Sequence, residues 1–285
     1  MMIRPVFLLI ACVLFCVSAS AQTRDRAALL DSLEKDGCVT IEKVRICKYD
    51  YPSDGANVEA ITFRPEADGK YPGVLLIPGY QRSATDYIYL GRILAAEGIA
   101  SVAVTQPGFG KSTGKADYVG PKTIGALTAG LDKFTRESYV DGKRMGIFGY
   151  SRGGMAASLL AVKLKDLKAV VLGAGIYDFK RAYDEIKIEG ITANMKAETG
   201  MTDAAIRERS SVMQMDRLQA PVLILHGEKD LNVPVSQALL LRDRLKELKK
   251  DFEIKLWPNA EHSIPRSEML PLTIDFFNRR LKGAK

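Results

Sequence analysis

The chain has 285 residues, 47% of them hydrophobic and 26% charged, with a formal net charge of +7. This suits one large α/β domain, or two small ones, with an ample core. The positive charge is not gathered into a basic block interleaved with aromatic residues, which argues against a nucleic-acid partner. With only two histidines and no Cys-x-x-Cys, we expect no metal site, and nothing implies an organic cofactor.

The first 21 residues have the pattern of a secretory signal peptide. Arg4 precedes an apolar run over residues 6–17, and residues 19–21 (Ala-Ser-Ala) offer a small-residue cleavage site. The run is shorter than the ~20 residues that span a membrane. We therefore predict cleavage after Ala21, a periplasmic or secreted mature chain (22–285) and no stable membrane association; an uncleaved anchor is the alternative.

Export changes the expectation for the cysteines. Two of the four leave with the signal peptide, and Cys38 and Cys47 remain in an oxidising compartment. A two-residue turn at Glu42-Lys43 would place them opposite each other in a hairpin, although Glu-Lys is not a favoured turn sequence. We predict one disulfide that closes this hairpin.

The elements then follow in chain order. Residues 24–35 are expected to form a short amphipathic helix. Strands are expected at 39–49, 58–64, 73–78, 99–104, 143–148, 169–172, 221–226 and 252–257. Helices are expected at 86–97, within 118–138, and at 155–167, 235–249 and 268–281. An antiparallel start followed by repeated βα units predicts a mostly parallel, doubly wound sheet of about eight strands.

One segment, residues 177–220, breaks this alternation. It is too long for a plain connection between a strand and a helix, and it carries isoleucines and methionines among charges. We interpret it as helices laid over the carboxyl edge of the sheet, forming a small lid. An enlarged surface insertion without a substrate role is the alternative. No second domain is indicated.

The motif that organises the chain is Gly149-Tyr150-Ser151-Arg152-Gly153, between an apolar strand and a helix-compatible segment. A Gly-x-Ser-x-Gly sequence in this context is typical of a nucleophilic serine on a sharp strand-to-helix turn. The small flanking residues allow strand and helix to pass closely. The helix N-terminus offers N–H groups to a developing oxyanion. The alternative is a structural turn with a buried serine.

A nucleophilic serine needs a base, and the choice lies between two histidines. His262 lies in a loop between the last strand and the last helix, and we predict it to be the catalytic base. His226 ends a buried strand and is interpreted as a packed residue that braces the following loop.

The acid that orients this base should lie on a loop at the same edge of the sheet. Asp230 follows the strand at 221–226 and gives the chain order Ser, Asp, His. Asp178 is the rival and Glu228 a weaker one. An aspartate here would otherwise cap the helix near Pro234.

The oxyanion hole requires two N–H donors. One should be the backbone of Arg152, directly after the nucleophile. The other should come from the loop at residues 79–82, with the backbone of Tyr80 preferred and that of Gln81 as the alternative.

Together these residues resemble the α/β-hydrolase superfamily, and within it the dienelactone-hydrolase-like and prolyl-oligopeptidase-like (S9-type) serine hydrolases. The resemblance covers residues 58–282 and rests on segments 70–74, 149–154, 220–227 with Asp230 and Val233-Pro234, and 260–262. It implies a single α/β-hydrolase domain with a Ser151, Asp230 and His262 triad. Pro78-Gly79 departs from the His-Gly of many relatives, and Ser151 from the cysteine of true dienelactone hydrolases.

The function expected is an exported serine hydrolase that cleaves carboxylic esters through an acyl-enzyme. A serine peptidase or amidase acting on short peptides is the alternative. A non-catalytic binding protein on the same fold is a third option, expected to lack a triad member. Gln81 and Arg82 are candidate substrate-binding residues. Arg82 and Arg152 would favour an anionic acyl group unless a nearby acid pairs with them.

Overall fold

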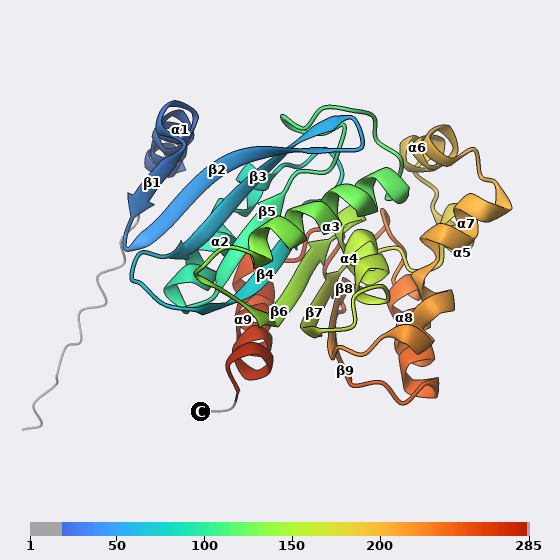
Figure 1. Ribbon diagram of the computed structural model, residues 1–285. Coiled ribbons are helices and arrows are strands. Elements are labelled where there is room, and N and C mark those ends of the chain that lie inside the picture. Colours follow the sequence, from blue (N-terminus) through green and yellow to red (C-terminus); the bar gives the residue numbers. More distant parts are fainter. Residues whose placement is uncertain (1–18, 284–285) are drawn as a thin grey trace, which may run out of the picture.

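The computed structural model describes residues 19–283, within which nine strands form one sheet with helices on both faces (Figure 1). The strands are β1 (Cys38–Ile41), β2 (Val44–Ser53), β3 (Ala56–Pro65), β4 (Tyr71–Ile77), β5 (Ala100–Val104), β6 (Val140–Tyr150), β7 (Leu167–Gly173), β8 (Val222–Gly227) and β9 (Phe252–Trp257). Their order in the sheet is β1-β2-β3-β5-β4-β6-β7-β8-β9.

The α-helices are α1 (Ala19–Asp36), α2 (Ile88–Ala96), α3 (Pro121–Thr135), α4 (Arg152–Ala161), α5 (Phe179–Glu185), α6 (Glu189–Thr199), α7 (Asp203–Arg209), α8 (Ser236–Glu247) and α9 (Arg266–Phe277). Short helical turns lie at η1 (Ala84–Tyr87), η2 (Ser211–Arg217) and η3 (Asn278–Lys282). In the described part of the chain, no helix is both long and apolar enough to cross a bilayer.

The predicted doubly wound sheet is confirmed. The first three strands and the β3–β5 pair are antiparallel, and every later pair, from β5–β4 to β8–β9, is parallel. The sheet has nine strands rather than about eight. At β4 the strand order reverses, because β5 lies on one side of it and β6 on the other. Such a reversal opens a crevice at the carboxyl ends of the strands.

The N-terminal hairpin has the expected register. Cys38 pairs with Cys47 across β1 and β2, and the structure joins the two sulfurs in the expected disulfide, with Cα atoms 4.1 Å apart. Glu42 and Lys43 form the turn with φ of 49° and 63°. Two residues with positive φ are what a tight hairpin turn requires, even though neither is glycine or asparagine. The disulfide closes a hairpin whose turn sequence is unfavourable by itself.

The predicted signal peptide lies largely outside the described residues. Residues 1–18 carry its basic and apolar parts together with Cys12 and Cys16. The expected cleavage site at residues 19–21 coincides with the first turn of α1, which begins earlier than the expected helix at 24–35.

Two cores form because successive strand residues point to opposite faces of the sheet. On β4, Leu75 and Ile77 belong to the core beneath α3, α4 and α8, while Val74 and Leu76 belong to the core beneath α1, α2 and α9. Figure 1 shows α3 and α4 over one face of the sheet and α9 on the other. Strand β4 is therefore buried on both faces.

Some helix ends differ from expectation. The helix expected at 155–167 ends at Ala161, because the chain turns there, with Lys163 and Leu164 donating to the carbonyl of Leu160, and β7 already begins at Leu167. The last helix changes to π-type hydrogen bonding at Asn278. These differences lie at element ends, where sequence signals are weakest.

Residues 177–220 form α5, α6, α7 and η2, which Figure 1 shows as a group at one end of the molecule. Phe179, Met195 and Met215 bury their side chains in the core beneath α3, α4 and α8. The segment is therefore a packed helical layer, and α6 contributes directly to the cavity described next.

Candidate active site

Ser151 lies on a sharp turn between β6 and α4. Its φ of 57° and ψ of −123° are strained for a residue with a side chain. The turn depends on close backbone approaches. A Cβ on Gly149 would lie 2.0 Å from the carbonyl oxygen of Gly153, and a Cβ on Gly153 would lie 2.0 Å from that of Ile77. Only glycine fits at either position, so the two glycines of the motif permit the turn that exposes the serine.

Three predicted side chains meet at this turn. The Nε2 atom of His262 lies 2.9 Å from Oγ of Ser151, and its Nδ1 donates to Oδ2 of Asp230 at 2.7 Å. They come from the loops after β6, β8 and β9 at the carboxyl edge of the sheet. In this geometry the imidazole can accept the serine proton while the carboxylate fixes its orientation and tautomer.

Asp230 is buried and held as an anion. Its Oδ1 accepts the backbone N–H groups of Asn232 and Val233, each at 2.9 Å. Burial acts to raise the pKa of Asp230, but hydrogen bonds from His226, His262 and the Val233 amide outweigh it and lower the pKa to about 2. The carboxylate therefore stays ionised at any pH at which a histidine base works.

The two alternative candidates for the orienting acid do not contact His262 in the structure. Asp178 caps α5 by accepting the N–H of Arg181, and Glu228 is exposed to solvent. His226 is fully buried, and its Nε2 donates to the carbonyl of Val233 at 2.8 Å, so it braces the loop as expected. The same Nε2 lies 3.3 Å from Oδ2 of Asp230, a contact that the sequence did not predict.

Tyr150 supports the loop that carries the base. Its hydroxyl donates to the backbone carbonyl of His262 and accepts the N–H of Ile264 at 3.3 Å. Its ring also meets the His262 ring edge-to-face, with centroids 5.9 Å apart. Burial is the main cause that raises the pKa of Tyr150 to about 12. The hydroxyl therefore remains a donor throughout the physiological range.

Two backbone amides border the serine. Arg152 is the first residue of α4, so its N–H has no acceptor within the helix. The other is in the turn at residues 79–82, closed by a hydrogen bond from Arg82 to the carbonyl of Gly79. A Cβ on Gly79 would lie 3.4 Å from that of Ser151, so this turn, which carries the N–H of Tyr80, packs against the nucleophile.

The Arg152 side chain is not available to a substrate. Its guanidinium forms a two-pronged ion pair with Glu198 of α6, at 3.1 and 2.7 Å, and is 3% exposed. It also lies over the rings of Tyr118 and Phe109, at 4.5 and 5.0 Å from their centroids. Of the two alternatives for Arg152, the structure shows the second, in which a nearby acid pairs with it.

Gln81 is also displaced from its expected role. It occupies a turn position with a φ of 53°, is exposed, and lies outside the cavity lining. Its amide nitrogen lies 3.5 Å from the Tyr80 hydroxyl instead. Arg82, by contrast, lines the cavity.

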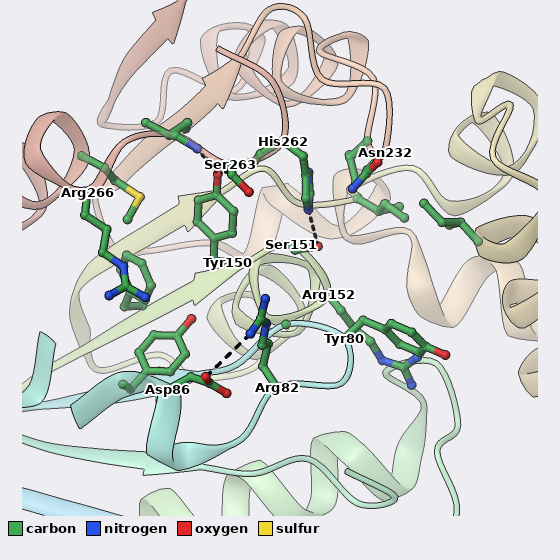
Figure 2. Close-up of a pocket in the computed structure, with 18 of the residues that line it drawn as sticks. Tyr80, Arg82, Asp86, Tyr150, Ser151, Arg152, Asn232, His262, Ser263 and Arg266 are labelled. Atoms are coloured by element: carbon green, nitrogen blue, oxygen red, sulfur yellow. Dashed lines mark hydrogen bonds and ion pairs between the residues drawn. The ribbon is translucent and has the colours of Figure 1, made fainter. Parts of the chain in front are cut away.

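The triad opens into a cavity of about 710 Å³. Figure 2 shows Ser151 at its centre, with Tyr80 and Asn232 on one side and Tyr150 and Arg266 on the other. The side toward α6, here called the α6 side, includes Tyr118, Ile176, Ile191, Asn194 and Val233. The side toward α9, here called the α9 side, includes Tyr87, Leu90, Phe148, Arg266 and Met269. The serine therefore lies between the α6 side and the α9 side of one cavity.

Comparison with known proteins defines the family. Residues 114–283 match the model of the prolyl oligopeptidase family of S9 peptidases, and the chain belongs to this family. It is 30% identical over 234 residues to the "Uncharacterized peptidase YtmA" of Bacillus subtilis, a match that covers 80% of this chain and 90% of that protein. The chain is accordingly an S9-family serine hydrolase, in a group whose named members include peptidases and esterases.

Solved structures show the same α/β-hydrolase fold. The acylaminoacyl peptidase of Pyrococcus horikoshii aligns with a TM-score of 0.74 at 21% identity, covering 86% of this chain and 43% of that one. Acetyl xylan esterase 1 from Thermoanaerobacterium aligns with a TM-score of 0.70 at 17% identity, covering 92% of this chain and 93% of the esterase. The chain thus spans less than half of the peptidase and nearly all of the esterase.

Proposed function

We propose that this chain hydrolyses carboxylic esters through an acyl-enzyme formed on Ser151, with His262 as base and Asp230 as its orienting acid. The observation that carries the proposal is the unbroken line of contacts from Ser151 Oγ to His262 Nε2 at 2.9 Å, and from His262 Nδ1 to Asp230 at 2.7 Å. These contacts depend on the strained backbone of Ser151. A turn that served only to connect β6 to α4 would give no reason for that strain.

The reaction proceeds in two steps, formation of the acyl-enzyme and its hydrolysis. His262 takes the Ser151 proton as Oγ forms a bond to the ester carbonyl carbon, and the backbone amides of Arg152 and Tyr80 bind the resulting oxyanion. The intermediate collapses, the carbon–oxygen bond to the alcohol breaks, and His262 gives its proton to the departing alkoxide. Water then attacks the acyl-enzyme, again with His262 as base, and releases the acid and the free serine.

An ester substrate is favoured over a peptide with a free amino terminus by the charges in the cavity. A protonated amine would need a carboxylate that faces it, and Asp86 is the one carboxylate among the cavity-lining residues of the described chain. Asp86 already accepts the N–H of Ser83 and lies near Arg26 and Arg82. Glu198, close by, is neutralised by Arg152.

A serine peptidase or amidase is the second candidate. It is supported by the match to the prolyl oligopeptidase family and by the similarity to YtmA of Bacillus subtilis, which is named a peptidase. A panel of acyl esters beside aminoacyl and N-acylated amides with the same acyl group separates the two candidates. Faster hydrolysis of the amides, compared as kcat/KM, would replace the esterase proposal with a peptidase.

The nucleophile itself is tested with a fluorophosphonate probe and peptide mapping by mass spectrometry. We expect an adduct on Ser151 that is absent from Ser151→Ala and His262→Ala, with circular dichroism showing that both variants are folded. Labelling at another residue, or no labelling of folded wild-type protein, would overturn the proposed triad.

We further propose that the chain is exported and cleaved after Ala21. The basic residue, apolar run and small-residue site of residues 4–21 support this, and so does a disulfide, because disulfides persist in oxidising compartments. Expression of the full chain in a bacterium, followed by fractionation and N-terminal sequencing, tests it. A mature protein starting at Gln22 is expected, and intact chain in the cytosol would contradict it.

A further inference from the structure

The α9 side of the cavity has a buried apolar floor that the proposed chemistry does not use. Phe148, Leu90 and Met269 line it and are 1%, 5% and 8% exposed. These residues belong to the core beneath α1, α2 and α9, whereas Tyr118, Ile176 and Val233 of the α6 side belong to the opposite core. The floor is built from strand β6 and helices α2 and α9, so it is a fixed part of the fold.

Two arginines stand at the rim of this apolar floor. Arg82 follows β4 and Arg266 begins α9, and both line the cavity. Figure 2 shows Arg266 beyond Tyr150 and Arg82 below Ser151. An apolar floor with guanidinium groups at its rim matches a ligand that is apolar along its length and anionic at one end.

The charge at this rim is not cancelled by the protein. Asp86 is the one carboxylate among the lining residues described, and it lies 3.8 Å from Arg82 and 3.6 Å from Arg26. Arg266 has no carboxylate within 4.0 Å in the described part of the chain. Arg26 and Arg82 therefore share Asp86. A substrate anion would supply the carboxylate that Arg266 lacks.

Arg152 differs from these two arginines because its guanidinium is already buried and paired within the protein. Arg152 is 3% exposed and binds both oxygens of Glu198. Arg82 is 68% exposed and makes only one long contact. The arginine adjacent to the nucleophile is thus structural, and the two arginines on the α9 side are the ones open to a ligand.

We propose that the α9 side is a binding site for an apolar substrate group that ends in a carboxylate, with Arg82 and Arg266 binding the carboxylate. This rests on the proposed ester hydrolysis and specifies its substrate class, esters whose acyl or alcohol part is an apolar acid. A cationic group would be repelled by the same rim, and a neutral apolar group would leave its charge unmatched.

The test compares two matched pairs of esters. In the first, para-(carboxymethyl)phenyl butyrate and its carboxamide differ only in a charge on the alcohol side. In the second, the monophenyl ester of adipic acid and its carboxamide differ only in a charge on the acyl side. The readout is the ratio of kcat/KM for acid over amide within each pair, corrected for the rate without protein.

We expect wild-type protein to prefer the acid in at least one pair, and Arg82→Gln/Arg266→Gln to lower that ratio about tenfold, a change of about 1.4 kcal/mol. Arg136→Gln/Arg207→Gln is the matched control, since it removes the same two charges from exposed positions outside the cavity lining. It should keep the wild-type ratio. The preference should also weaken with added salt, because the rim is exposed. Thermal melting of all variants excludes loss of fold.

A ratio near one in both pairs would overturn the inference while hydrolysis of the amide esters still supports the proposed function. Binding to Ser151→Ala gives a readout that does not need turnover. Calorimetry should show tighter binding of the acid ester than of the amide ester in at least one pair, and the difference should disappear when Arg82 and Arg266 are also changed to glutamine. Equal binding of acid and amide to Ser151→Ala in both pairs would reject the site even if the chain proved to have no esterase activity.

Discussion

The two histidines of this chain both approach Oδ2 of Asp230, at 3.3 Å for His226 and 2.7 Å for His262. The two imidazole rings differ in their burial and in their other hydrogen-bond partners. His226 is fully buried and uses the same nitrogen to hold the carbonyl of Val233. His262 is partly exposed and offers its second nitrogen to Ser151. Contact with Asp230 therefore does not distinguish the two histidines. What distinguishes His262 is that its second ring nitrogen contacts Ser151 and that its ring lines the cavity.

The largest difference should come from removing each imidazole in turn. His262→Ala should lower kcat by a factor of roughly 10⁶, as loss of a triad base does when the serine can no longer be deprotonated. The variant should remain folded, because the His262 ring lines the cavity and belongs to neither hydrophobic core. Steady-state hydrolysis of an activated ester measures the effect.

His226→Ala is the internal control for that measurement. The residue lies in contact with the same aspartate, yet its loss should leave ester hydrolysis within about tenfold of wild type once the protein is folded. If His226→Ala lost as much activity as His262→Ala, the assignment of different roles to the two histidines would be wrong.

The next effect concerns Asp230, which joins the two histidines. Its native pKa is about 2, below its usual value of 3.8. Between these values the unfolded chain binds more protons, so the free energy of unfolding should fall as pH drops from about 4 to about 2. The contribution lost is on the order of 2 kcal/mol. Urea unfolding at several pH values measures it.

Asp230→Asn provides the comparison for this pH series. The variant should lose the part of the acid-induced destabilisation that Asp230 contributes, while destabilisation by other carboxylates remains. Identical pH dependence of wild type and Asp230→Asn would show that the contacts of Asp230 with its two histidines do not stabilise the native state.

A smaller effect is expected from the buried histidine itself. His226→Ala leaves the carbonyl of Val233 without its donor, and an unsatisfied buried polar group costs about 1–3 kcal/mol. His226→Gln places an amide N–H near the same carbonyl and should recover part of this loss. The free energy of unfolding in urea is the measurement. Equal stability of the alanine and glutamine variants would contradict a bracing role.

Much of this comparison could be predicted from the sequence. Each triad residue follows an apolar strand, and parallel strands bring their carboxyl ends to one edge, so Ser151, Asp230 and His262 could be placed together. The disulfide pair could be found because its nine-residue separation fits a hairpin, and hairpin register is local.

What could not be predicted depends on side-chain contacts between distant segments. Glu198 lies 46 residues from Arg152, on a helix whose position over the sheet no local pattern specifies. The contact of His226 with Asp230 depends on the path of a loop, and the rim position of Arg266 depends on where α9 begins. Gln81 was misplaced because a positive φ changes where a side chain projects, and its sequence carries no glycine to indicate one.

The smallest effect concerns the hydrogen bonds that hold the loop of the partly exposed His262. They correspond to the contact between the buried His226 and the carbonyl of Val233. The Tyr150 hydroxyl, with its pKa raised to about 12, holds the His262 carbonyl and the Ile264 amide. Tyr150→Phe keeps the ring and removes both hydrogen bonds, so we expect unfolding free energy to fall by about 1 kcal/mol. Because the His262 loop loosens, kcat should fall about threefold to tenfold with KM less affected. Tyr183→Phe, a partly buried tyrosine outside the cavity lining, is the control and should match wild type in kcat. Unchanged kcat in Tyr150→Phe would mean that the edge-to-face ring contact alone positions the base.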